Sequence, residues 1–237
     1  KIEQNIILPF NDEEEKLYVA NLAEANKELQ ELYDLEGSDK MQILKLLTRL
    51  RQLCLEPRLV YDDIDQPSSK LKACMELIKT MQEDKQKVLL FSSFTSVLDL
   101  IAEECQKAGI TYYMLTGSTN KEDRRELVSR FQKDDTTVFL ISLKAGGTGL
   151  NLTYADAVYI FVHLWNVSTQ NQATDRAYRI GQKNNVQVFN LVMKDSVEEK
   201  IIELQKRKKE LADMFVENNS GGLSQMSKED ILSLFTV

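Results

Sequence analysis

The sequence predicts an α/β fold in which a mostly parallel sheet lies between two layers of helices, with helical extensions at both ends of the chain. Between residues 67 and 193, short apolar runs alternate with longer amphipathic stretches. The apolar runs are nearly continuous, which is typical of strands that are buried on both faces of a parallel sheet. Outside this region, apolar residues recur at helical spacing. We therefore divide the chain into a helical segment (residues 1–66), an α/β core (67–193) and C-terminal helices (194–237).

The first segment is predicted to form two helices, over residues 13–35 and 41–55. The apolar run IILPF, followed by DEEE, has the pattern of a strand that ends in a magnesium-binding acid. Pro9 disfavours a central strand, however, and acidic side chains stabilise the first turn of a helix. We therefore expect these acids to begin a helix rather than to bind a metal.

The core is predicted to alternate between strands and helices. Its strands are expected at residues 87–91, 112–115, 137–141, 157–162 and 186–192, and its helices at 70–81, 96–108, 120–131 and 168–180. Ligands of such sheets gather at the carboxyl ends of the strands.

The composition excludes several classes of protein. The 237 residues carry a net charge of -7, and no stretch approaches the roughly 18 apolar residues of a membrane span. Three cysteines without CxxC spacing predict reduced core thiols, and the single histidine, His163, leaves little for a metal site. We expect an intracellular protein and, because the chain begins without methionine, a fragment of a longer one.

The net negative charge comes entirely from the first segment. Residues 1–66 hold 15 acidic and 8 basic side chains, whereas residues 67–237 hold 22 of each. Attraction to nucleic acid would therefore come from local patches, and binding should be weak and salt-sensitive.

The segment QATDRAYRIGQ contains the strongest candidate for phosphate chemistry. On a helix, Gln172, Arg176 and Arg179 share one face. Planar guanidinium groups match phosphate oxygens bidentately and stay charged when partly desolvated. A solvated helix face is the alternative, since Asp175 lies four residues before Arg179. That pair leaves Gln172 and Arg176 unexplained.

Hydroxyl groups follow the first core strand. Ser92, Ser93 and Thr95 lie between KVLLF and the start of a predicted helix. Free backbone N–H groups at a helix start can receive a phosphate. Simple capping of the helix by Thr95 or Ser96 is an equal alternative.

A glycine-rich stretch follows the third core strand, in SLKAGGTGLNLTYAD. Ser142 ends the strand, and Gly146, Gly147 and Gly149 follow. Clustered glycines let backbone amides approach an anion closely, although a tight turn would also use them. It is not a P-loop, because Gly-Lys occurs nowhere in the sequence.

Together these segments resemble a known family. QATDRAYRIGQ is similar to motif VI of superfamily-two helicases, in the form typical of Swi/Snf-type DNA translocases. FSSFT resembles motif IV, LTGST with DRRELVSRF resembles the next block, and SLKAGGTGLNLTYAD resembles motif V. The flanking helices resemble the family's protrusion and brace. The chain departs from the family at Glu56, where a histidine is usual, and in FVHLWN, which lacks an acid and a second tryptophan.

The resemblance implies a RecA-like second motor lobe and roles for individual residues. Gln172, Arg176 and Arg179 would be catalytic, with both arginines reaching the γ-phosphate of ATP across a cleft. The residues facing the nucleotide would be Gly147, Gly149, Asn151 and Asp175. The residues contacting DNA would be Ser92, Ser93, Thr95, Ser142, Lys144, Thr148 and Trp165. For Trp165, a place in the core is an equal alternative to stacking on DNA.

The resemblance also implies partners and cofactors. ATP and Mg²⁺ would be held mainly by a first RecA-like lobe, whose phosphate loop and magnesium acid are absent from this sequence. Double-stranded DNA and that lobe would be the partners, in the nucleus of a eukaryote or in the cytoplasm or nucleoid of a bacterium. By itself this lobe should not hydrolyse ATP. An RNA helicase lobe and a non-catalytic interaction module are the alternatives.

Overall fold

The computed structural model describes residues 2–34, 40–146, 157–162, 187–207 and 226–236. The chain forms two compact units. We call Lys1–Ile6 with Leu71–Leu191 the α/β unit, and Ile7–Lys70 with Val192–Val237 the helical unit. Each unit is described by itself below.

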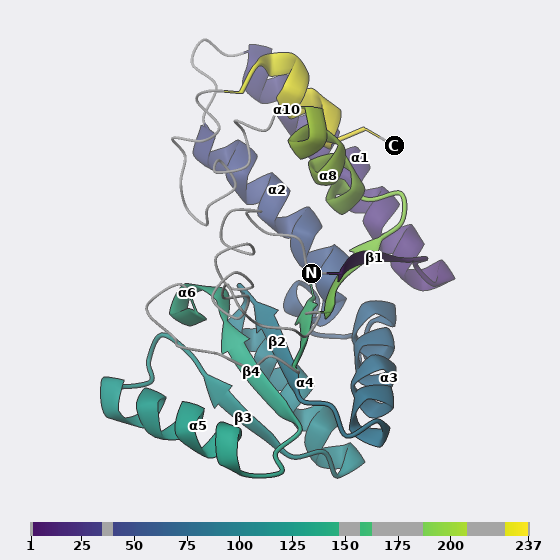
Figure 1. The fold of residues 1–237 in the computed structure, drawn as a ribbon. Helices are drawn as coiled ribbons and strands as arrows, with labels where there is room; N and C mark the ends of the chain where they lie inside the picture. The colour runs from purple at the N-terminus through teal and green to yellow at the C-terminus, as the bar shows by residue number, and fades with distance from the viewer. Residues whose placement is uncertain (1, 35–39, 147–156, 163–186, 208–225, 237) are drawn as a thin grey trace. The chain divides into compact units, whose positions relative to one another are not determined.

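The α/β unit is built on a six-stranded sheet (Figure 1). Its strands are β1 (Ile2–Leu8), β2 (Val88–Ser92), β3 (Tyr112–Leu115), β4 (Val138–Ser142), β5 (Val158–Phe161) and β6 (Gln187–Met193). They lie in the order β1-β6-β5-β2-β4-β3. The pairings of β2 with β4 and β5, of β3 with β4, and of β5 with β6 are parallel. The predicted parallel α/β fold is confirmed.

Helices cover both faces of this sheet. The connection from β2 to β3 crosses β4, and the connection from β3 to β4 returns in the opposite direction. Since such crossovers are right-handed, α4 (Thr95–Ala108) and α5 (Lys121–Lys133) lie on opposite faces. Leu89 is in register with Phe139, and both pack in one cluster with Phe131 of α5. The residues of β2, β4 and β5 are all buried, as predicted from their continuous apolar runs.

The remaining helices are α1 (Asp12–Asp34), α2 (Lys40–Leu55), α3 (Ser69–Glu83), α6 (Leu143–Gly146), α8 (Val197–Arg207) and α10 (Lys228–Leu234), with a 3₁₀ helix at Pro57–Leu59. The predicted ends of the helices at residues 13–35, 41–55, 70–81, 96–108 and 120–131, and of all five core strands, lie within two residues of those observed. The predicted helix at 168–180 lies outside the described residues.

Strand β1 was not predicted. It occupies one edge of the sheet, and Pro9 follows its last residue, Leu8. Pro9 was thus correctly taken to exclude a central strand, but an edge strand that ends before a proline is compatible with it. The side chains of Ile2 and Ile7 are about half exposed, so this strand has no buried apolar run of the kind that identified the others.

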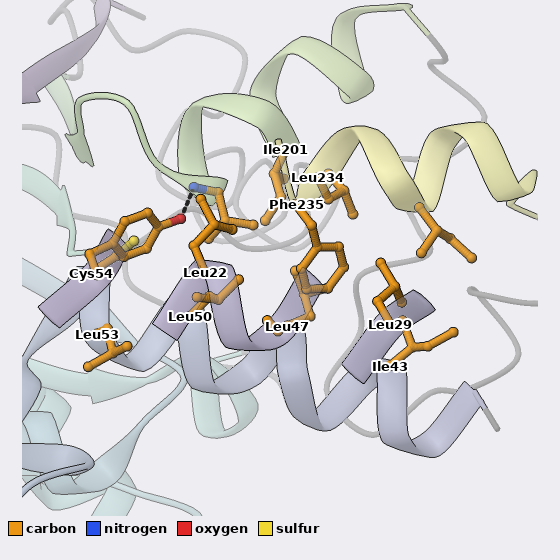
Figure 2. Close-up of a cluster of buried hydrophobic side chains, with 14 of the residues drawn as sticks. Leu22, Leu29, Ile43, Leu47, Leu50, Leu53, Cys54, Ile201, Leu234 and Phe235 are labelled. Carbon is orange, nitrogen blue, oxygen red and sulfur yellow. Dashed lines mark hydrogen bonds between the residues drawn. The ribbon is translucent and has the colours of Figure 1, made fainter. Parts of the chain in front are cut away.

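The helical unit has a core that is shared by the N-terminal and C-terminal helices (Figure 2). Leu22 and Leu29 of α1 pack there with residues of α2, with Ile201 of α8 and with Phe235 after α10. The Tyr18 hydroxyl accepts a hydrogen bond from the backbone N–H of Val197 at 2.7 Å. Segments that are far apart in the sequence therefore stabilise one another.

Three carboxylates hold the chain where α3 begins. Glu56 accepts from the N–H of Ser68 at 3.0 Å, and Glu14 accepts from the N–H of Ser69 at 3.1 Å. Glu198 forms an ion pair with Lys70 at 2.6 Å. Glu56, which stands where the family usually has histidine, is buried and thus has a definite structural role in this chain.

Cys54, Cys74 and Cys105 are free and buried, which confirms the prediction of reduced core thiols. Burial raises the pKa of Cys105 to about 11 and also raises the pKa of Cys54. Among the helices of the described ranges, none is long and apolar enough to cross a membrane.

Candidate nucleic-acid interface

The carboxyl ends of β2, β3 and β4 border a cavity of about 550 Å³ in the α/β unit. These ends meet at one edge because the three strands are parallel neighbours. The cavity is lined by Ser93, Thr95, Asp99, Met114, Thr116, Gly117, Ser118 and Ser142. Three segments that the sequence separates thus contribute hydroxyl groups to one site.

At the end of β2, two adjacent serines have different environments. Ser92 is fully buried, and its hydroxyl accepts from the N–H of Phe94 at 3.1 Å and lies 3.2 Å from the Phe94 carbonyl. Ser93 lines the cavity. Ser92 is the last residue of β2, whereas Ser93 lies in the bend between β2 and α4.

The start of α4 contributes Thr95 to the lining. The N-cap residue of α4 is Phe94, and it makes no side-chain capping hydrogen bond. Capping by Thr95 or Ser96, the alternative considered for these residues, is therefore wrong. The first turn of a helix carries N–H groups without intrahelical partners and a partial positive charge, both of which suit an anion.

The turn after β3 contributes Thr116, Gly117 and Ser118. The Thr116 and Ser118 hydroxyls lie 2.8 Å apart. The N–H of Thr119 donates to the Thr116 carbonyl at 3.1 Å, and the Thr119 hydroxyl accepts from the N–H of Thr116 at 3.1 Å. Apart from Gly117 and its two chain neighbours, no heavy atom of the described residues lies within 4 Å of the position that a Cβ of Gly117 would take, so the backbone is accessible there.

At the end of β4, the Ser142 hydroxyl accepts from the N–H of Ala145 at 3.2 Å. Ser142 is buried, and its hydroxyl thereby holds the first turn of α6. Lys144 lies within α6.

The lining could hydrogen-bond an anion mainly through neutral groups. Ser93, Thr95, Thr116 and Ser118 offer hydroxyls, and α4 offers the positive end of its dipole. Neither lysine nor arginine occurs among the described residues that line the cavity, and Asp99 adds a negative charge. Such a site can orient a phosphodiester group by hydrogen bonds while holding it weakly.

Of the predicted site residues, the structure brings Ser93, Thr95 and Ser142 together at the cavity. Ser92, the last residue of β2, precedes Ser93 and does not line the cavity. The predicted residues outside the described ranges are Gly147, Thr148, Gly149, Asn151, Trp165, Gln172, Asp175, Arg176 and Arg179. The sequence predicted no site role for Asp99, Thr116, Gly117 or Ser118, although LTGST was matched to a block of the family. The signal for the last three was present, because LTGST directly follows a predicted strand.

No group of histidine, cysteine, aspartate and glutamate suited to a metal ion occurs within the described ranges.

Comparison with known proteins relates this architecture to a family. Residues 69–181 match the helicase conserved C-terminal domain. The SWI2/SNF2 ATPase core of Sulfolobus solfataricus, solved in complex with dsDNA, superposes with a TM-score of 0.79 at 26% identity, over 98% of this chain and 49% of that one. The chain is a homologue of the SWI2/SNF2 ATPase C-terminal lobe. The resemblance found in the sequence motifs is thereby confirmed.

Two curated relatives show how much of a SWI2/SNF2 protein the chain represents. An uncharacterized ATP-dependent helicase of Mycoplasma pneumoniae is 34% identical over 99% of this chain and 22% of its own length. The ISWI chromatin-remodeling complex ATPase ISW1 of Saccharomyces cerevisiae is 33% identical, over 99% of this chain and 22% of its own length. The chain thus spans about a fifth of these relatives.

Proposed function

We propose that the chain is the second motor lobe of an ATP-dependent translocase on double-stranded DNA, and that the cavity bounded by β2, β3 and β4 binds the DNA backbone. The observation that carries this proposal is the convergence of hydroxyls from three strand ends and an uncapped helix start on one cavity. The Sulfolobus relative, whose core was solved with dsDNA, supports the same ligand.

Neutral donors suit a motor that must release DNA in every cycle. A net hydrogen bond to a neutral group contributes about 0.5–1.5 kcal/mol, so a few of them orient a phosphate without holding it tightly. Asp99 weakens the binding of an anion further. The lobe would therefore hold one DNA strand in register and still let it go.

The second part of the proposal concerns ATP. Arg176 and Arg179, with Gln172 on the same predicted helix face, would stabilise charge that develops on the γ-phosphate. Gly147, Gly149, Asn151 and Asp175 would face the nucleotide. The phosphate loop and the magnesium acid would come from the first lobe, so that opening and closing of the two lobes moves their DNA contacts relative to each other.

The DNA-binding proposal can be tested on the 237-residue chain by fluorescence anisotropy with a short duplex at low salt. Replacing Ser93 and Thr95 together with alanine should weaken binding at least fivefold, since two hydrogen bonds are lost at about 0.5–1.5 kcal/mol each. Asp99→Asn should strengthen binding at least twofold. Ser96→Ala is the control, because Ser96 is exposed on α4 outside the cavity lining. Equal affinities for all variants would contradict the proposal.

The ATP proposal requires both lobes. Arg176→Ala and Arg179→Ala should each lower DNA-stimulated ATP turnover at least tenfold, with a smaller effect on ATP binding, because the arginines act on transition-state charge. Arg179→Lys should not rescue turnover fully, since an ammonium lacks the planar fork. Normal turnover in the folded arginine variants would favour a non-catalytic interaction module.

A further inference from the structure

The side chain of Arg124, on α5, is bound to the turn that lines the cavity. Its Nε donates to the Thr119 carbonyl at 3.0 Å, and its Nη2 donates to the Thr116 carbonyl at 3.5 Å. Arg124 is partly buried and does not line the cavity itself. The guanidinium therefore lies behind the turn.

Hydrogen bonds between Thr116 and Thr119 close the turn. The Thr116 carbonyl also accepts from the N–H of Thr119, and the Thr119 hydroxyl accepts from the N–H of Thr116. Asn120 caps α5 directly after the turn, accepting from the N–H of Asp123 at 2.8 Å. Arg124 thus joins the first turn of the helix to the loop that precedes it.

Holding the Thr116 carbonyl has a consequence for Gly117. The C=O of Thr116 and the N–H of Gly117 belong to one trans peptide unit, in which they point in opposite directions. Two donors, Arg124 and the N–H of Thr119, hold the carbonyl on one side. The N–H of Gly117, a lining residue without a side chain, is thereby directed to the other side.

We propose that Arg124 is a positioning residue for binding of the DNA backbone. It acts through the turn, by fixing the Thr116 and Thr119 carbonyls so that the N–H of Gly117 and the hydroxyls of Thr116 and Ser118 face a phosphodiester in the cavity. The inference rests on the proposed function of this cavity. In this role, Arg124 favours DNA binding without contacting the phosphodiester group.

Arg125 provides a matched control. It is the next residue of α5, carries the same charge and is exposed. If either guanidinium acted only by attracting DNA from a distance, the two alanine variants would lose similar affinity. A positioning role requires the loss to occur at Arg124 alone.

The experiment measures duplex binding by the 237-residue chain over a range of salt concentrations. Arg124→Ala should weaken binding at least fivefold and Arg125→Ala less than twofold. Because Arg124 neutralises no phosphate, Arg124→Ala should leave the slope of log affinity against log salt unchanged, whereas a direct contact would lower it by about 0.9. In a Thr116→Ala, Ser118→Ala background, the further loss from Arg124→Ala should be smaller than the loss in the parent chain, because only the orientation of the Gly117 N–H is then left to lose.

The outcomes separate this inference from the function it rests on. If replacing Thr116 and Ser118, like replacing Ser93 and Thr95, leaves DNA binding unchanged, the cavity does not bind DNA and the proposed function fails. If replacing Thr116 and Ser118 weakens binding but Arg124→Ala does not, or lowers the salt slope by about one, only the positioning role is overturned. If Arg124→Ala does not fold, Arg124→Lys takes its place, because an ammonium lacks the planar fork of the guanidinium. We then expect DNA affinity to fall at least twofold, with an unchanged slope of log affinity against log salt. Wild-type affinity in Arg124→Lys would refute the positioning role.

Discussion

Breaking the buried ion pair between Lys70 and Glu198 should strongly destabilise the helical unit. Lys70 Nζ lies 2.6 and 2.8 Å from the two carboxylate oxygens of Glu198, and the two side chains are only 1% and 2% exposed. Glu198 Oε1 also accepts from the N–H of Met193 at 2.9 Å. One carboxylate thus joins the start of α3 to the chain that leaves β6.

The size of the effect follows from this geometry. In Glu198→Gln, an amide can still accept from Met193, but the Lys70 ammonium stays buried without a counter-charge. Removing one partner of a buried pair costs about 3–5 kcal/mol. At about 2–4 °C per kcal/mol for a chain of this size, the melting temperature should fall by about 6–20 °C. Adding Lys70→Met removes the stranded charge, so the double variant should be at least about 2 kcal/mol more stable than Glu198→Gln.

Calorimetry and urea unfolding followed by circular dichroism would measure these differences. Glu203→Gln is the control, because it makes the same charge change at an exposed position of α8 and should shift stability by less than about 0.5 kcal/mol. The reasoning is refuted if Glu198→Gln is as stable as Glu203→Gln. It is also refuted if Lys70→Met brings no recovery, since the cost would then not arise from an unpaired charge.

Two further predictions concern single buried groups. The buried Tyr159 hydroxyl has no hydrogen-bond partner among the described residues, so Tyr159→Phe should raise the free energy of unfolding by about 1 kcal/mol. Tyr113→Phe, which removes a hydrogen bond to Asp134, should lower it. A loss of stability in Tyr159→Phe would show that the Tyr159 hydroxyl is hydrogen-bonded. Burial raises the pKa of Cys105 to about 11, so at pH 8 its thiol stays protonated and should react with a disulfide reagent only in denaturant; rapid reaction of the native protein would contradict this.

The α/β core could be predicted closely because its strands are buried on both faces. Each of β2, β4 and β5 is an unbroken apolar run, and such runs have sharp ends in the sequence. Strand β1 lacks this signal, because an edge strand with exposed side chains is defined by its pairing with β6, far along the chain. The order of the strands likewise depends on pairing between distant segments, which the local pattern of apolar residues does not predict.

The candidate site was predictable in outline and not in detail. The rule that ligands gather at strand ends located Ser93, Thr95 and Ser142. It did not distinguish Ser92 from Ser93, because which of two adjacent hydroxyls faces the cavity depends on where the strand ends and how the chain bends after it. Arg124 was hidden for a different reason: in the sequence it is one cation of a charged helix, and only its hydrogen bonds to carbonyls reveal its role.

In the proposed function, the arginines of the α/β unit have two different roles. Arg124 donates hydrogen bonds to the carbonyls of Thr116 and Thr119, and the described lining of the cavity includes the hydroxyls of four serine and threonine side chains besides that of Ser142. In the proposed function, Arg176 and Arg179 act instead on the charge of ATP at the moment of cleavage. This arrangement is consistent with the different demands of the two ligands. In the proposed function, DNA is released in each cycle, which favours contacts worth about 0.5–1.5 kcal/mol each. The reacting phosphate would need stabilisation only in the transition state, for which charged donors are the most effective.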